Sequence, residues 1–167
     1  MEEGGHLGWY DMEGGIGLNE KSIEGIVNIA AKPIVERKAI AEGKLHLTAS
    51  TKQAILDKTV KKGDVLEAST VAILQAVKDT PRLIPHCHPI PLEGTNVTWR
   101  WENTDLWCEV EVVAHYKTGI EMEALAGVSA GLLCVFDMVK SLEKDDAGQY
   151  PSAEISHIRV VKKFKGN

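Results

Sequence analysis

A stretch without any charged residue, 124–136, restricts the fold of this chain more than any other feature. It consists of apolar and small side chains, and it is shorter than the roughly 20 apolar residues that a membrane-spanning helix needs. A helix that is apolar on nearly all sides has to lie in a protein core. Thr118 and Glu121 have the spacing of a capping box, which predicts a helix start. We therefore expect a buried central helix from about Thr118 to about Lys140.

Size and composition predict an ordinary globular protein with one domain. The chain has 167 residues, of which 44% are hydrophobic and 26% are charged, and this suffices for one core. The net charge of -5 argues against a nucleic-acid-binding protein, whose surface would be basic. The N-terminus lacks the charged-then-apolar pattern of a signal peptide, so we expect a cytoplasmic protein outside the membrane. The three cysteines are too widely spaced for a disulfide framework.

Periodicity and turn signals divide the chain into a tail and one folded domain. Residues 1–22 are rich in glycine and have no periodicity, which predicts a flexible tail before a single catalytic α+β domain, 23–167. Alternating apolar residues predict strands, and capping residues or a proline bound the helices. The expected strands are 26–29, 35–47, 96–101, 106–115 and 154 to about 161. The expected helices before the central one are 50–57, capped by Ser50, and 64–79, capped by Asp64 with Glu67 and stopped by Pro81.

The order of these elements indicates the fold class. After the short strand candidate at 26–29, the chain runs strand, helices, strand, strand, helix, strand. This is the split βαβ pattern of an α+β ferredoxin-like sandwich, which has an antiparallel sheet with helices on one face. The central helix would then lie in the core, where a charged side chain needs a partner or a function.

Four charged residues flank the apolar part of the central helix. Asp137 and Lys140 are three apart and share a helix face, in an apolar neighbourhood that predicts low exposure. A buried carboxylate beside a lysine suits acid–base chemistry, whereas an exposed pair would contribute little. Glu123 has no capping role, lies where an acid suits the helix dipole, and is expected to return close to the side of Asp137. Glu121 has the alternative role of closing the helix end.

Two further motifs carry groups that bind anions or protons. Lys62 lies beside a glycine turn and before a helix N-terminus, where a lysine can hold a phosphate, although a solvated turn lysine is more common. His86-Cys87-His88 lies between prolines, which predicts a stiff extended segment with both histidines on one side. We interpret it as a rigid wall of a ligand site ahead of a zinc site, because the sequence has no second cluster of zinc ligands. Buried histidines bonded to backbone groups are the third alternative.

Taken together, these motifs indicate a pocket for an anionic substrate that undergoes proton transfers. They also resemble a known family. Residues 62–65 (Lys-Gly-Asp-Val), 83–89 (Leu-Ile-Pro-His-Cys-His-Pro), 117–125 (Lys-Thr-Gly-Ile-Glu-Met-Glu-Ala-Leu) and 136–140 (Phe-Asp-Met-Val-Lys) are similar to the signature of the MoaC family of molybdenum cofactor biosynthesis. The resemblance runs from about Ile26 to Lys163. It implies a ferredoxin-like fold and a homohexamer, a trimer of dimers with active sites at the dimer interfaces.

The resemblance also implies a reaction and a set of site residues. The family's lyase converts (8S)-3′,8-cyclo-7,8-dihydroguanosine 5′-triphosphate to cyclic pyranopterin monophosphate and releases pyrophosphate. No cofactor is implied as a requirement, and magnesium bound with the triphosphate stays open. The residues that match catalytic positions are Asp137, Lys140, Lys62 and Lys163, the last with Lys162 as the adjacent alternative. The residues that match substrate-binding positions are His86, Cys87, His88, Glu121, Met122 and Glu123, and no metal ligand is implied.

Some positions depart from the family pattern, and a second class of function stays open. Asn28 stands where an aspartate is usual, His86 where some members have an apolar residue, and the glycine-rich segment expected after the last strand is short. The cations expected near the triphosphate are Lys62, Lys117, Lys163 and Arg82. The alternative to an enzyme is a non-catalytic ferredoxin-like module that binds a nucleotide or a metal and regulates a partner.

Overall fold

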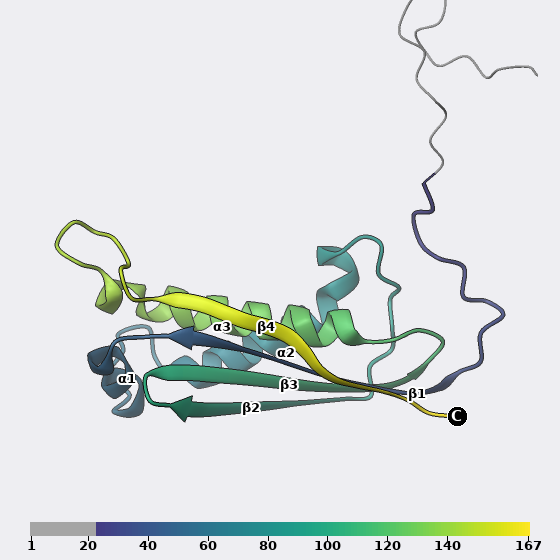
Figure 1. The fold of residues 1–167 in the computed structure, drawn as a ribbon, viewed down its shortest axis with the longest axis horizontal. Coiled ribbons are helices and arrows are strands. Elements are labelled where there is room, and N and C mark those ends of the chain that lie inside the picture. The colour runs from purple at the N-terminus through teal and green to yellow at the C-terminus, as the bar shows by residue number, and fades with distance from the viewer. Residues whose placement is uncertain (1–22) are drawn as a thin grey trace, which may run out of the picture.

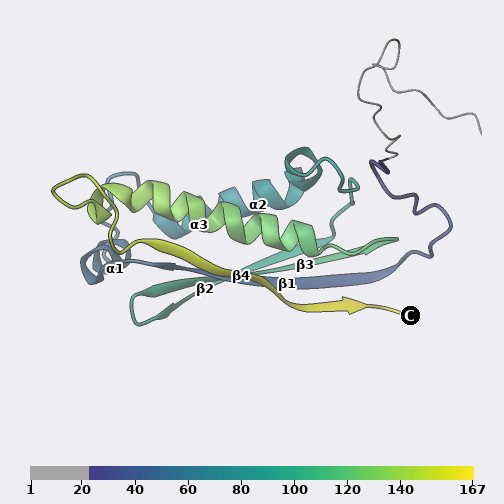
Figure 2. The same ribbon diagram turned by 45° about the horizontal axis from the view of Figure 1, so that its top comes forward.

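The computed structural model describes residues 23–167, and the predicted flexible tail at residues 1–22 lies outside them. An antiparallel sheet carries helices on one face, as Figure 1 and Figure 2 show. The elements are β1 (Val35–His46), α1 (Ala49–Leu56), α2 (Val65–Leu83), β2 (Gly94–Glu102), β3 (Asp105–Tyr116), α3 (Glu121–Glu143) and β4 (Glu154–Lys165). The strand order is β2-β3-β1-β4, and all neighbours are antiparallel. The predicted α+β ferredoxin-like class is confirmed.

The sheet buries one face against the helices because its side chains alternate between the two faces. On β3 every second residue is completely buried, and the residues between them are only partly covered. Trp99 and Trp101 of β2 pack partly buried against the same core, as their alternation predicted. The fully buried residues of β3 are Leu106, Cys108, Val110, Val112 and Ala114.

Glycines seat α3 closely against both α2 and the sheet. A Cβ atom at Gly131 would lie 2.6 Å from Cγ1 of Ile73 on α2, and one at Gly127 would lie 2.8 Å from Cγ2 of Val77. On the sheet side, a Cβ atom at Gly43 of β1 would lie 2.9 Å from a side-chain carbon of α3. The small residues of the apolar stretch therefore fix the position of α3 between two neighbours, since close-packed interiors leave no room for an extra methyl group.

The expectation that α3 is buried on nearly all sides is wrong for the single chain. Val128, Leu132 and Val135 are completely buried, but Leu133 on the other side of the helix is 59% exposed. The sheet covers one side of α3 and α2 covers a second, so a third side stays open within residues 23–167. By length and composition alone α3 could also cross a membrane, but its packing makes it the core helix of this domain.

Two predicted helix starts are also wrong, while a third is confirmed. Ile120 is the N-cap of α3 and makes no side-chain capping bond, so Thr118 and Glu121 do not form a capping box. Thr48, rather than Ser50, caps α1. The α2 start is confirmed, because the carboxylate of the N-cap Asp64 accepts a hydrogen bond from the N–H of residue 67.

Pro81 does not stop α2, which continues to Leu83. A proline inside a helix lacks the N–H that would bond to the carbonyl four residues earlier, here that of Val77. The hydroxyl of Thr80 donates to this carbonyl oxygen instead, at 3.2 Å, and also to that of Ala76 at 3.0 Å. The neighbouring threonine thus satisfies the carbonyl that the proline leaves without a donor.

The predicted strand at residues 26–29 is also wrong, because residues 23–34 form neither helix nor strand. Side chains from other parts of the domain bond to three carbonyls of this segment, those of Gly25, Val27 and Ala30. At the other end of the chain, β4 is longer than predicted and runs to Lys165, which brings both Lys162 and Lys163 into the sheet.

Candidate active site

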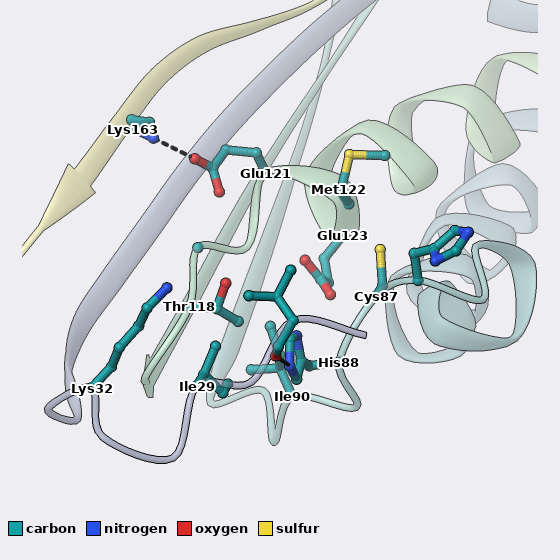
Figure 3. Close-up of a pocket in the computed structure, with 13 residues that line it drawn as sticks. Ile29, Lys32, Cys87, His88, Ile90, Thr118, Glu121, Met122, Glu123 and Lys163 are labelled. Atoms are coloured by element: carbon teal, nitrogen blue, oxygen red, sulfur yellow. Dashed lines mark hydrogen bonds and ion pairs between the residues drawn. The ribbon is translucent and has the colours of Figure 1, made fainter. Parts of the chain in front are cut away.

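A pocket of about 430 Å³ lies at the end of the molecule where α3 begins. Figure 3 shows its walls, which come from residues 23–34 (the N-terminal segment), the loop after α2, the start of α3 and the end of β4. These segments are far apart in the sequence, and the ferredoxin-like topology brings them to one end of the sheet. The pocket includes all six predicted substrate-binding residues and one predicted catalytic residue: His86, Cys87, His88, Glu121, Met122, Glu123 and Lys163.

Glu123 is the most deeply buried charged group of this pocket, with 3% of its surface exposed. Burial raises the pKa of its carboxyl group, the backbone N–H of Glu123 lowers it in part, and the charge of Glu121 raises it again. No side chain among residues 23–167 is hydrogen-bonded to it. A buried carboxylate in this state can accept hydrogen bonds from N–H groups of a ligand or exchange a proton with it.

Glu121 and Lys163 form an ion pair at the rim of the pocket, with 2.8 Å between Nζ and Oε1 (Figure 3). Burial works to raise the pKa of Glu121, but the Lys163 ammonium, a backbone N–H and the charge of Arg37 together lower it. Lys163 lies opposite the buried Ala39 in the sheet, whereas Lys162 lies opposite Ile40 and therefore faces the side away from α3. The structure brings Lys163, and not Lys162, to the pocket.

The His86-Cys87-His88 segment forms one wall, but it is not extended throughout, because the N–H of Cys87 closes a turn onto the carbonyl of Ile84 at 2.9 Å. Nδ1 of His86 bonds to the carbonyl of Gly25, and Nε2 of His88 bonds to that of Val27 at 2.8 Å. Both histidines thus reach the same segment. Residues 23–167 contain no group of three side chains placed to hold a metal ion.

Cys87 is unsuited to act as a nucleophile. Burial, followed by the charge of Glu123, raises the pKa of its thiol. A thiol needs a lowered pKa to react as thiolate at neutral pH. We therefore assign Cys87 to the pocket wall.

The other three predicted catalytic residues form a separate cluster near the end of α3. One carboxylate oxygen of Asp137 lies 2.7 Å from Nζ of Lys140, and the other lies 2.6 Å from Nζ of Lys62, which also donates to the carbonyl of Asp137 at 2.9 Å. Lys62 reaches Asp137 from the turn before α2, where Gly63 adopts a φ of 102° that other residues rarely adopt. These three side chains form the lysine–aspartate cluster.

The predicted low exposure of Asp137 is wrong in the single chain, where 55% of its side chain is exposed. Val135 before it and Met138 after it occupy buried positions of α3, Phe136 is only partly buried, and Asp137 faces outward. The two lysines, Lys140 first, lower the pKa of Asp137 to about 2, and Asp137 in turn raises the pKa of Lys140. Asp137 and Lys140 are therefore both charged at neutral pH.

The pocket and the lysine–aspartate cluster are far apart on one chain. Fourteen residues separate Glu123 from Asp137, which corresponds to about 21 Å along a helix at 1.5 Å per residue. Fourteen residues at 3.6 per turn leave the two side chains about 40° apart around α3, as expected, but Glu123 is buried there and Asp137 is exposed. One chain therefore carries the predicted site residues as two separate groups.

The pocket also contains residues that the sequence did not single out as site residues. Lys32 and Thr118 line it, and in Figure 3 Lys32 extends from the N-terminal segment toward Thr118. The sequence around Lys32 has no periodicity, so it does not predict that this lysine lines the pocket. Two expected phosphate ligands lie elsewhere, because Lys117 donates to the carbonyl of Ala30 at 2.7 Å and the exposed Arg82 pairs with Asp79 on α2.

Comparisons with known proteins point to one family. A model described as the MoaC family matches residues 26–166. A protein from Thermococcus kodakarensis is 48% identical over 149 residues, which are 89% of this chain and 95% of the relative. One from Methanospirillum hungatei is 51% identical over 140 residues (84% and 90%), and one from Sulfurisphaera tokodaii is 50% identical over 140 residues (84% and 93%). Each of the three is named "Probable cyclic pyranopterin monophosphate synthase".

Proposed function

This chain belongs to the MoaC family, and from that premise we propose that it is a cyclic pyranopterin monophosphate synthase of molybdenum cofactor biosynthesis. The reaction is the lyase reaction given above, in which the cyclic dihydroguanosine triphosphate is rearranged and pyrophosphate leaves. The observation that carries this proposal is the family match over residues 26–166, which includes every residue of the pocket and of the lysine–aspartate cluster. We expect this activity in the cytoplasm.

The active site forms between two copies of the chain in this proposal. The pocket of one copy would face the lysine–aspartate cluster of another, because about 21 Å along α3 separates the two groups within one copy. Exposed apolar side chains, among them Leu133 of α3 and Phe164 of β4, support association, since large exposed apolar residues are typical of contact surfaces. The homohexamer implied by the family, a trimer of dimers, would provide such an interface.

The two groups have complementary roles in the reaction. The pocket binds the ring of the substrate, with Glu123 accepting hydrogen bonds from its N–H groups and Lys163 contributing a positive charge. Lys62 and Lys140 neutralise the phosphates and stabilise the departing pyrophosphate. When these lysines turn toward the phosphates, the pKa of Asp137 rises from its low value, and Asp137 becomes able to accept a proton from the ring.

A direct assay tests the activity. The purified full chain is incubated with the cyclic dihydroguanosine triphosphate, and pyrophosphate and the oxidisable pterin product are measured. We expect both in equal amounts. Binding of the triphosphate without release of pyrophosphate would contradict the enzyme and favour the alternative, a regulatory nucleotide-binding module. The proposal requires no cofactor, so treatment with a chelator before the assay should leave turnover intact when magnesium is supplied only with the substrate.

A mixture of two inactive variants tests whether the site is shared. Asp137→Asn removes the proton acceptor from one copy, and Glu123→Gln removes the buried carboxylate from the other. If each site uses Asp137 from one chain and Glu123 from its partner, half of randomly formed dimers are mixed and each has one intact site. Co-expression should then restore about a quarter of wild-type activity. Activity no higher than the average of the two separate variants would contradict a shared site.

A further inference from the structure

Three side chains of the folded domain hold the N-terminal segment, residues 23–34, against the pocket. His86 and His88 bond to the carbonyls of residues 25 and 27, and Lys117 donates to that of Ala30 at 2.7 Å. Within the segment, the N–H of Lys32 closes a turn onto the carbonyl of Ile29 at 3.1 Å. The segment has no regular structure of its own, so these bonds determine where Lys32 lies.

In the part of the chain that the structure describes, Lys32 is the pocket lysine without a counter-ion. The other lysine of the pocket, Lys163, is neutralised by Glu121 at 2.8 Å. Within residues 23–167 no carboxylate forms an ion pair with Lys32, although its side chain lines the pocket together with the buried Glu123. A lysine held at a pocket wall without a counter-ion attracts an anionic group of a ligand.

We propose that Lys32 binds a phosphate group of the substrate, and that Lys117 and His88 are positioning residues which act by holding the N-terminal segment. This proposal rests on the function proposed above, because the substrate there carries a triphosphate. The pocket then separates two kinds of recognition: Glu123 accepts N–H donors of the ring, and Lys32 binds a phosphate at the outer wall. It also reassigns His88 from contact with the substrate to support of the segment.

Binding of inorganic pyrophosphate to the full chain tests the contact, with calorimetry as the readout. Lys32→Met should weaken binding about tenfold, the effect of losing one hydrogen bond between charged groups. Lys32→Arg, which keeps the charge, should recover most of the affinity. Lys78→Met is the matched control, because Lys78 is an exposed lysine of α2 outside the pocket. Equal affinities for Lys32→Met and Lys78→Met, or undetectable binding to the wild type, would overturn the proposal.

Steady-state kinetics separates this proposal from the proposed function. Lys32→Met should raise KM for the triphosphate about tenfold and change kcat much less, since Lys32 is proposed to hold a phosphate of the bound substrate and transfers no proton. An active wild type with an unchanged KM in Lys32→Met refutes the role of Lys32 and leaves the enzyme function standing. A wild type that releases no pyrophosphate refutes the function itself.

A double-mutant cycle tests the role of Lys117. If Lys117 acts only by placing Lys32, then Lys117→Met should raise KM when it is the only substitution. The same change should have little further effect on KM in the Lys32→Met background. Additive effects would show that Lys117 contacts the substrate by itself and would overturn its assignment as a positioning residue.

Discussion

Each end of α3 carries a carboxylate, but the two carboxylates differ in burial and in the direction in which their pKa is shifted. At the start of the helix, Glu123 is buried, has a raised pKa and, among residues 23–167, has no cationic side chain bonded to it. Near the end, the carboxylate of Asp137 is open to solvent and two lysines lower its pKa to about 2. Exposure and counter-ions, rather than residue type, therefore decide in which direction the pKa of each carboxyl group shifts.

This difference indicates at which end of α3 a single chain already forms an enclosed site. The pocket already has walls, a buried carboxylate and an ion pair at its rim. The lysine–aspartate cluster has the charged groups but no cover, and exposed ion pairs are screened by water and perform little chemistry by themselves. The catalytic function proposed for it would therefore depend on a surface that excludes water, and a second copy of the chain would supply such a surface in the proposed assembly.

The largest effect on turnover is expected from a substitution of Asp137, near the exposed end of α3. Asp137→Asn should lower kcat by at least about a hundredfold, the usual contribution of an acid–base group. The melting temperature and the oligomeric state should change little, because the side chain is exposed and supports no buried residue. Pyrophosphate release, thermal unfolding and gel filtration measure the three quantities. Asp146→Asn, in the exposed loop after α3, is the control and should behave like the wild type. Near-normal turnover of Asp137→Asn would refute the assignment.

A smaller effect distinguishes Lys162 from Lys163, the adjacent lysines of β4. Lys163→Met should lower kcat/KM about tenfold, because it removes a charge from the pocket rim and leaves Glu121 without its partner. Lys162→Met changes the net charge by the same amount, but on the opposite face of the sheet. Its kcat/KM should stay within about twofold of the wild type. Pyrophosphate release at varied substrate concentration measures both. Similar losses in the two variants would mean that net charge, rather than the pocket contact, determines the effect.

The sequence predicted those parts of the molecule whose pattern depends on a single buried face. The strands β1, β2 and β3 were placed to within a few residues, because burial on one face forces alternation. The start of α2 was predicted because a capping aspartate acts locally. The length of α2 was not, since the helix passes Pro81 only because the hydroxyl of Thr80 bonds to the carbonyl that the proline leaves unpaired.

Two features of the candidate site could not be predicted, for different reasons. The sequence around Asp137 is apolar, but it does not tell which apolar residues of α3 face the core and which, like Leu133, stay exposed in a single chain. Lys32 lies in a segment without periodicity, which long-range bonds from His86, His88 and Lys117 hold in place. The family motifs did identify most of the pocket residues, although periodicity alone did not separate them from the lysine–aspartate cluster.

The smallest expected effect is on stability and tests the buried end of α3. In the unfolded chain the carboxyl of Glu123 titrates near 4.5, and in the folded protein its pKa is higher, chiefly because of burial. Folding therefore favours the protonated form, so the penalty for the charged form is absent below pH 4.5 and appears as the pH rises through the folded pKa. The amide of Glu123→Gln has nearly the same shape and never carries this charge.

We expect Glu123→Gln to melt a few degrees above the wild type at pH 8, where about 1 kcal/mol corresponds to about 2–4 °C for a chain of this size. The difference should disappear near pH 4, because both proteins are then uncharged at this position. Substrate binding at pH 8 should weaken in the same variant, since the amide also presents N–H donors to the ring. A gain in melting temperature that persists at pH 4 would assign the stabilisation to packing instead. No gain at pH 8 would mean that the pKa of Glu123 is not raised in the assembled protein because its carboxylate is paired, most directly by a residue of a second copy, and the contrast between the two ends of α3 would then hold only for the isolated chain.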